Sequence, residues 1–290
     1  MQFDYSNKVK AMRPSIIREL LKQMADPGLI SFAGGNPSAD AFPAKEIREI
    51  SDALLAGPPA DVLQYSITEG YPPLIAQAKK YLNRQWQTVH EGDEVIITSG
   101  SSQVMDFMAK LLCNEGDVVA TEDPAFLGAL NAFRSQGATL VGVEMEPDGV
   151  SLAALEAVLS ANPKPRFYYT IPNFQNPTGY TTSLAKRKAV YALCQKHGVP
   201  ILEDNPYGEL RFTGEDIPPI KAFDTDNLVV YAASMSKIFA PGMRVAFCAG
   251  SADLMGKMTV AKQGNDVHTN LWGQRAIDRF FEQYDIDAHI

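Results

Sequence analysis

The chain has 290 residues, of which 46% are hydrophobic and 21% charged, and its formal net charge is −8. This balance is typical of a folded globular protein with a sizeable core and excludes a disordered chain. The length favours one large domain with a smaller appendage. The acidic balance and the lack of a Lys/Arg run exclude a typical nucleic-acid binder, so an anionic ligand would need a local positive site.

The number of cysteines and the N-terminal sequence indicate the cellular compartment of the protein. The three cysteines are odd in number and show no metal-ligand spacing, so we interpret Cys113, Cys194 and Cys248 as reduced, buried thiols. The N-terminal sequence MQFDYSNKVKAMRPS has no apolar core segment typical of a signal peptide. We therefore expect a cytoplasmic protein that binds no metal, no membrane and no nucleic acid.

The N-terminal part of the chain predicts mainly helices. Helical spacing occurs in three segments, residues 14–25, 44–56 and 73–88. Residues 29–36, with the sequence LISFAGGN, predict a short extended piece that ends in a glycine turn.

From residue 94 onward, short apolar runs alternate with longer amphipathic segments. The predicted strands are Glu94–Thr98, Val118–Thr121, Thr139–Val143, Phe167–Ile171, Pro200–Glu203, Leu228–Ala232 and Arg244–Ala249. The predicted helices are 102–113, 125–136, 151–160, 183–197 and 251–283. This alternation predicts an α/β fold, a mostly parallel seven-stranded sheet with helices on both faces. The last strand follows its predecessor too closely for a crossover helix, which favours antiparallel pairing there.

Polar or glycine-rich motifs follow five of these strands, at the edge where open α/β sheets bind ligands. The first, SGSSQ at residues 99–103, is either an N-capped turn or an anion site whose N–H groups and hydroxyls suit a phosphate. Phe126, in TEDPAF, is either a core ring or a ring that stacks on a flat cofactor. Asn176, in NPTG, belongs either to a simple turn or to the contacts of a bound ring oxygen.

The last two motifs carry charge. Asp204, in LEDNPY, ends a buried strand, where a carboxylate is costly without a partner; it either caps a turn or pairs with a pyridinium nitrogen. Lys237 follows Ser234 and Ser236, and Arg244 comes seven residues later across a Pro-Gly turn. Two hydroxyls and a guanidinium make a phosphate clamp, and a lysine beside them can form a Schiff base. We favour that interpretation over a loop lysine with a surface arginine.

The ordered set meets the needs of pyridoxal 5′-phosphate (PLP), which requires an amine, an acid for its ring nitrogen and a phosphate cradle. The chain resembles the fold-type I, class I/II PLP-dependent aminotransferases, most closely the 2-aminoadipate/kynurenine aminotransferase and MocR-type branch. The resembling motifs, between residues 32 and 247, are FAGGNP, LQYSITEGY, ITSGSSQ, EDPAF, NPTG, LEDNPYGEL and SMSKIFAPGMRVAF. The resemblance implies transfer of an amino group from an amino acid to a 2-oxo acid.

The resemblance also implies individual roles. Lys237 would form the Schiff base and shuttle the substrate's proton, and Asp204 would pair with the pyridine nitrogen. Asn176 and Tyr207 would hydrogen-bond the ring 3-oxygen, and Phe126 would stack on the ring. The phosphate would be held by Ser101, Ser102, Ser234, Ser236 and Arg244. The expected catalytic residues are therefore Lys237, Asp204 and Tyr207.

Two further residues extend this implied site. Tyr65 would reach the phosphate of a neighbouring subunit, which implies a homodimer, and Gly35 would border the substrate together with Asn176. The Asp204 carboxylate would keep the ring nitrogen protonated. Positive charge from Arg244 and partial burial would both lower the pKa of Lys237.

The chain departs from the family pattern in two places. Phe126 stands where many relatives have Tyr, which keeps the stacking and loses a hydroxyl. Relatives continue beyond Ile290 with most of a small domain, including the arginine that grips the substrate carboxylate. Arg13 and Arg18 either contribute to side-chain recognition or lie on a solvated helix face.

The implied domain organisation has three parts. Residues 1–45 would form an N-terminal arm and part of a small domain, residues 46–283 the large PLP-binding domain, and residues 284–290 the start of a C-terminal small domain. Two other functions use the same residues. One is a PLP-dependent lyase or decarboxylase, and the other is the effector-sensing domain of a MocR-type regulator, which the acidic balance disfavours.

Overall fold

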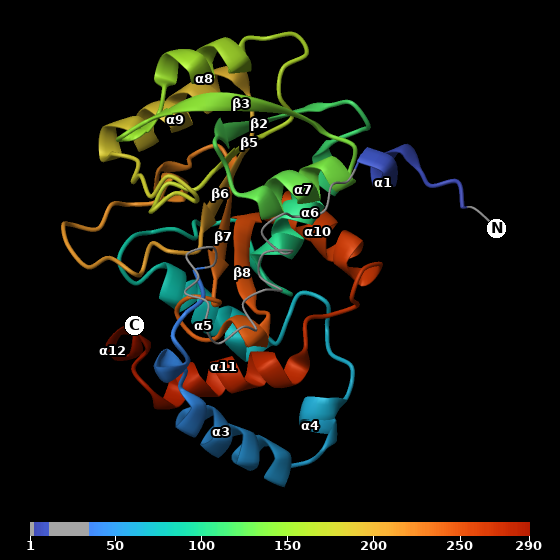
Figure 1. The fold of residues 1–290 in the computed structure, drawn as a ribbon. Coiled ribbons are helices and arrows are strands. Elements are labelled where there is room, and N and C mark those ends of the chain that lie inside the picture. Colours follow the sequence, from blue (N-terminus) through green and yellow to red (C-terminus); the bar gives the residue numbers. More distant parts are fainter. Residues whose placement is uncertain (1–2, 12–34) are drawn as a thin grey trace, which may run out of the picture.

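An eight-stranded sheet runs through the part of the chain that the computed structural model describes, residues 3–11 and 35–290 (Figure 1). The strands lie in the order β1-β8-β7-β6-β5-β2-β3-β4. Their bounds are β1 Asp93–Thr98, β2 Val118–Asp123, β3 Thr139–Glu146, β4 Gly149–Val150, β5 Tyr168–Thr170, β6 Ile201–Asn205, β7 Val229–Ser234 and β8 Ala246–Ser251.

Strand direction confirms the mostly parallel sheet. The neighbours β3, β2, β5, β6 and β7 are parallel, whereas β8 is antiparallel to both β7 and β1, as its short connection predicts. The strand beyond the seven predicted ones is β4, a two-residue piece antiparallel to β3. The carboxyl ends of β1, β2, β5, β6 and β7 therefore meet at one edge, together with the amino end of β8.

Helices cover the sheet. Their bounds are α1 Asn7–Ala11, α3 Ala44–Ala56, α4 Ala60–Leu63, α5 Pro72–Leu82, α6 Ser101–Leu112, α7 Leu127–Ser135, α8 Leu152–Leu159, α9 Leu184–His197, α10 Ala252–Gln263, α11 Leu271–Gln283 and α12 Ile286–His289. Short 3₁₀ turns are η2 Ala39–Ala41, η3 Ile220–Phe223 and η4 Pro241–Met243. In the described ranges, none of the helices has the length and apolar character that crossing a bilayer requires.

Alternation along the strands sends apolar side chains to both faces, as helices on both faces require. Ile96 of β1 packs in a buried cluster with side chains of α6, α7 and α10. Its neighbour Ile97 packs with Tyr231 and with side chains of α3, α5 and α11 on the opposite face. Farther along that sheet, Ile201 packs with side chains of α8 and α9. Figure 1 shows these helix groups around the central strands.

Two predicted helices are shorter than their sequence pattern. The helix predicted over 73–88 ends at Leu82, because the side-chain oxygen of Asn83 accepts hydrogen bonds from the N–H groups of Thr88 and Val89 and turns the chain. The predicted helix 251–283 is two helices, and Asn270 starts the second by accepting from the N–H of Gly273 at 2.7 Å. Residues 14–25 and 29–34, with Arg13 and Arg18, lie outside the described residues.

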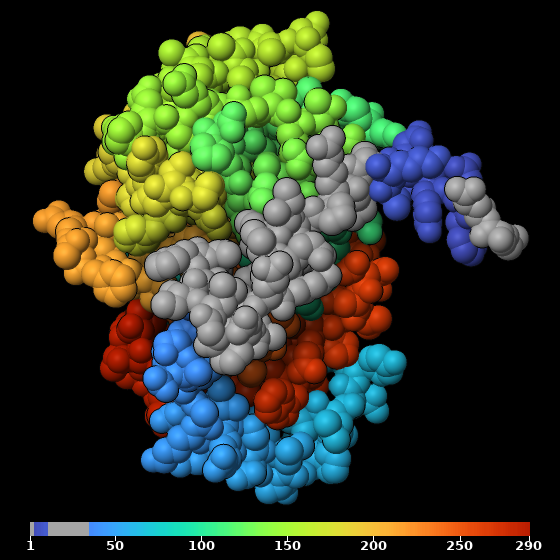
Figure 2. Space-filling model, in the orientation of Figure 1, coloured from blue at the N-terminus to red at the C-terminus, as the bar shows by residue number. Residues whose placement is uncertain are grey.

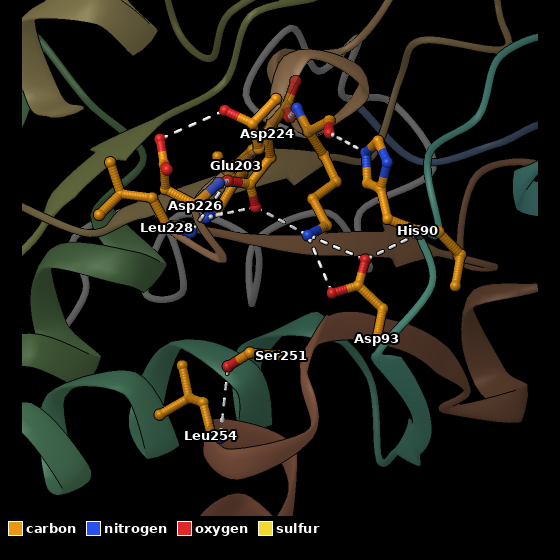
Figure 3. Close-up of polar contacts among 12 residues, drawn as sticks. His90, Asp93, Glu203, Asp224, Asp226, Leu228, Ser251 and Leu254 are labelled. Atoms are coloured by element: carbon orange, nitrogen blue, oxygen red, sulfur yellow. Dashed lines mark hydrogen bonds and ion pairs between the residues drawn. The ribbon is translucent and has the colours of Figure 1, made fainter.

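A buried ion cluster ties the opposite edge of the sheet together. Lys221, 1% exposed, places its ammonium 3.0 Å from Asp93 and 2.8 Å from Asp224. His90 contacts the backbone carbonyl of Lys221 at 2.9 Å, and Glu203 accepts two backbone N–H groups of η3. Figure 3 shows these contacts around His90, Asp93, Glu203 and Asp224. The cluster joins the start of β1 to the segments before β7.

Lys221→Met tests this cluster. The substitution keeps the side-chain volume but leaves two buried carboxylates without their counter-ion, so we expect the free energy of unfolding to fall by about 3–5 kcal/mol. Urea unfolding monitored by circular dichroism measures it. The exposed Lys110 of α6 provides the matched control, since Lys110→Met should change stability by no more than about 0.5 kcal/mol. Equal stability of the two variants would contradict the assigned role.

Candidate active site

The strand register brings distant polar motifs to one edge. Thr98 at the end of β1 and Ser234 at the end of β7 both pair with Ala246 at the start of β8. The turn after β1, the loop after β7 and the residue Arg244 before β8 are therefore neighbours. This explains why motifs far apart in the sequence converge.

A glycine turn and Arg244 fit closely together. Gly100 has φ +82°, and a Cβ built there would lie 2.0 Å from a guanidinium nitrogen of Arg244. The guanidinium donates to the carbonyl of Ser99 and to the hydroxyl of Ser236, both at 3.4 Å. Only glycine combines this backbone conformation with room for the arginine.

Hydroxyls and backbone donors belong to the same two turns that Arg244 contacts. Ser101 and Ser102 occupy the first turn of α6, a 12-residue helix whose first N–H groups lack intrahelical partners. Ser234 accepts a hydrogen bond from the N–H of Ser236 at 3.2 Å. A guanidinium, several hydroxyls and a helix N-terminus together suit a phosphate-sized anion.

Asp204 is buried, and only one of its two carboxylate oxygens has a hydrogen-bond partner among the described residues. Its Oδ2 accepts from the hydroxyl of Tyr169 at 3.0 Å, whereas its Oδ1 is a buried atom without a partner in the described part of the chain. Burial raises the pKa of this carboxyl to about 7. The next residue back, Glu203, points to the other face and accepts two backbone N–H groups at 2.8 Å.

An unpartnered buried oxygen at this place favours a ligand. Three other buried side-chain atoms in the described residues also lack partners, on Tyr81, Tyr168 and Asp278. Asp204 alone among the four comes from the predicted set of site residues, beside the carboxyl ends of the parallel strands. A protonated ring nitrogen is the kind of donor that would satisfy its free oxygen.

The loops after β2, β5 and β6 carry the three residues predicted to contact a ring. Asn176 donates to the hydroxyl of Tyr207 at 3.2 Å, and burial raises the pKa of Tyr207. The half-buried ring of Phe126 lies over Gly128, where a Cβ would meet a ring carbon at 2.4 Å. Phe126 and Tyr207 pack against the same apolar cluster as Tyr169, so they border one region.

The ammonium of Lys237 lies in a partly buried setting. Its ammonium donates to the backbone carbonyl of Gly35 at 2.7 Å, and burial lowers its pKa. The N-terminal segment therefore touches the candidate site. Tyr65, in contrast, lies on the surface with 79% of its side chain exposed and its ring edge-on to His268, 5.9 Å between centroids.

Arg187 is a residue of this site that sequence analysis missed. It is fully buried on α9 and donates to the carbonyls of Pro172, Thr182, Ile217 and Pro218 and to the side chain of Asn173. It thereby joins the loop of Asn176 to the loop after Tyr207. The sequence could have indicated its burial, because Arg187 lies three residues before Val190 and so on the same, buried face of the helix.

Tyr169 is a second missed residue, since an aromatic in the apolar run YYT predicts only core packing. Its hydroxyl selects which Asp204 oxygen stays free. Glu122, at the end of β2, is a third. Its buried carboxyl accepts from Thr170 and Gln175, and burial raises its pKa to about 7.

Comparison with known proteins identifies the family. The sequence profile described as aminotransferase class I and II matches residues 27–277. The chain belongs to the class I and II aminotransferases. The resemblance inferred from the motifs is therefore confirmed, and with it an enzyme that transfers amino groups between amino acids and 2-oxo acids. PLP is the cofactor of this family. The family match does not favour a lyase or an effector-sensing domain.

Named relatives cover most of this aminotransferase. It is 36% identical over 290 residues to aromatic-amino-acid aminotransferase 1 of Thermococcus litoralis, covering 99% of this chain and 70% of the relative. It is 38% identical over 275 residues to the 2-aminoadipate transaminase of Thermus thermophilus, covering 94% and 68%. The solved kynurenine aminotransferase of Pyrococcus horikoshii superposes with a TM-score of 0.92 at 35% identity, covering 98% of this chain and 71% of that one.

Asp204→Asn should stabilise the aminotransferase without ligand. Because the folded pKa is raised to about 7, the folded state resists ionisation, and this costs stability increasingly as pH rises from about 4 to 7. We expect a gain of about 2–4 kcal/mol at pH 8 that shrinks toward pH 4. Thermal unfolding of ligand-free protein across this range measures it.

Asp224→Asn provides the matched contrast. Burial alone would raise the pKa of Asp224, but the hydrogen bonds and charge of Lys221 and two backbone N–H groups hold it below its ordinary value. Its carboxylate therefore stabilises the fold above about pH 4, and Asp224→Asn should lose stability where Asp204→Asn gains it. A loss of stability with Asp204→Asn at pH 8 would contradict the assignment of a buried carboxylate with one unpartnered oxygen.

Proposed function

We propose that this chain binds PLP at the carboxyl edge of its sheet and that Lys237 is the amine that links it. The observation that carries the proposal is the unpartnered Oδ1 of buried Asp204, which a protonated ring nitrogen would satisfy. When bound, PLP supplies an electron sink that allows an amino acid to lose its Cα proton.

The residues of the chain divide the remaining work. Asp204 would hold the proton on the ring nitrogen, because its carboxylate would gain a charged partner there. Asn176 and Tyr207, whose side chains lie 3.2 Å apart, would hydrogen-bond the ring 3-oxygen. Phe126 would pack on the ring face. Burial lowers the pKa of Lys237, which favours its neutral amine, the form that would take the substrate's Cα proton and return it.

The phosphate end would be held by the positive charge of Arg244 and by hydroxyl or N–H donors of four serines. The serines are Ser101, Ser102, Ser234 and Ser236. In an acidic chain this local clamp, rather than the global field, selects the anion. Gly35, whose carbonyl accepts from Lys237, would border the substrate.

Substrate preference and domain organisation follow the relatives. The relatives compared above are named for aromatic amino acids, 2-aminoadipate and kynurenine, so we propose amino donors of these kinds. We also propose residues 1–45 as an arm with part of a small domain, 46–283 as the large domain and 284–290 as the start of a C-terminal small domain.

Borohydride reduction tests the cofactor site. Protein mixed with PLP should turn yellow, and reduction should attach a pyridoxyl group to the peptide that contains Lys237, as read by mass spectrometry. Lys237→Ala should abolish this adduct, whereas Lys257→Ala, on the exposed side of α10, should retain it. An adduct on another lysine in the wild-type protein would contradict the proposal. Bleaching by amino acids and recovery with 2-oxo acids would report the reaction itself.

We further propose that the active unit is a homodimer. Four apolar side chains of neighbouring segments are strongly exposed, namely Leu63, Tyr65, Ile67 and Val267. Figures 1 and 2 show the segment after α4 alongside the loop between α10 and α11, and the contact of Tyr65 with His268 agrees. Such a face suits a second copy of the chain.

Mixed dimers test whether Tyr65 crosses to the neighbouring site. Tyr65→Ala should weaken PLP binding about tenfold by removing one phosphate hydrogen bond, and Lys237→Ala should remove covalent attachment. A hybrid of the two variants contains one site with both residues intact. Equilibrium dialysis should then recover tight binding at half the sites. Additive loss in the hybrid, or a protein that sediments as a monomer, would contradict the proposal.

A further inference from the structure

Behind the phosphate turn lies a lysine that no solvent reaches. Lys262, in the last turn of α10, is 0% exposed, and its ammonium makes four hydrogen bonds. The acceptors are both carboxylate oxygens of Asp266 at 2.7 and 2.8 Å, Gln103 Oε1 at 3.1 Å and Thr269 Oγ1 at 2.9 Å. The charge is therefore paired and saturated, which a buried ammonium requires.

The same acceptors hold Ser99. The N–H of Ser99 donates to Gln103 Oε1 at 2.9 Å, and its hydroxyl donates to Asp266 Oδ2 at 2.6 Å. That hydroxyl also lies 3.1 Å from Thr269 Oγ1. On its other side the carbonyl of Ser99 accepts from Arg244 at 3.4 Å. Ser99 thus joins the buried ion pair to the turn that opens α6.

Charge explains why this arrangement is fixed. Burial alone would raise the pKa of Asp266, but hydrogen bonds from Lys262, Ser99 and Gln103 and the charge of Lys262 hold it below its ordinary value. The carboxylate stays ionised and keeps accepting from Ser99. Gln274 anchors the loop of this carboxylate, since it donates to the carbonyl of Thr269 at 2.7 Å and accepts from the N–H of Tyr71.

We propose that the Lys262–Asp266 ion pair positions the phosphate-binding turn of Ser99, Gly100 and Ser101. It acts through Ser99 and fixes the first turn of α6 relative to Arg244 before the anion arrives. Lys262 touches no reacting atom and is a positioning residue, and the inference rests on the proposed PLP site. Without the pair, the turn would have to be ordered by the ligand, at a cost in affinity.

Comparing PLP with pyridoxal, which lacks the phosphate, isolates this role. We expect Lys262→Met to weaken PLP binding about 10- to 100-fold, the factor found when residues that orient metal ligands are replaced. Pyridoxal binding should change less than about twofold. Fluorescence titration of both compounds gives the ratio. Lys262→Met combined with Asp266→Leu should show the same loss while removing the unpaired buried carboxylate that could prevent folding.

Lys221→Met is the matched control, because it disrupts a buried lysine cluster at the opposite edge of the sheet. It should lower stability and leave the PLP-to-pyridoxal affinity ratio unchanged. An unchanged ratio in both Lys262 variants would overturn the positioning role. A wild-type protein that binds PLP no better than pyridoxal would instead overturn the phosphate site itself, so the two failures are distinguishable.

Discussion

A carboxylate that is buried with one oxygen unpaired is the constraint on which the rest of the site depends. Asp204 Oδ1 lies out of water, and Tyr169 occupies the other oxygen. A fold tolerates such an atom when a ligand later supplies the missing partner. Lys237 lies in the loop after β7, and Arg244 precedes β8 at the same edge of the sheet. In the proposed site, Asp204 would set the orientation of a ring with a protonated nitrogen.

The two edges of the sheet handle charge in opposite ways. At one edge, Lys221 and its two carboxylates satisfy each other and hold the strand starts together. At the other edge, one oxygen of Asp204 has no partner among the described residues, and Lys237 and Arg244 contact only neutral acceptors there. Glu203 and Asp204 are adjacent in the sequence, but successive side chains of a strand point to opposite faces. Glu203 therefore belongs to the cluster around Lys221, and Asp204 belongs to the candidate site. Stability and function therefore separate along a single strand.

Sequence reasoning was most reliable where a strand ends in a motif. Apolar runs that alternate with helical segments predict parallel strands, and the carboxyl ends of parallel strands meet at one edge. The polar residues after β5, β6 and β7 therefore had to share that edge. It was weaker where a side chain overrides periodicity, as when Asn83 ends α5 through its own oxygen. The eighth strand was missed because a two-residue pairing has no period.

The residues that support the site were harder to find. Tyr169 and Lys262 act through groups that are distant in sequence, and their local context is an apolar run and a helix end. Only the folded register brings Tyr169 to Asp204, and only the loop after α10 brings Asp266 to Ser99. Arg187 could have been found from the sequence, because a charged side chain on the buried face of a helix requires hydrogen-bond partners. These residues show that the ligand-contacting set alone does not define the site.

The protonation state of the bound ring nitrogen tests the central claim most directly. PLP labelled with ¹⁵N in its ring, bound to the wild-type protein and to Asp204→Asn, reports that state by its nitrogen chemical shift. We expect a protonated nitrogen in the wild-type complex near neutral pH and an unprotonated one in the variant. The same nitrogen shift in both complexes would contradict the pairing of Asp204 with the ring.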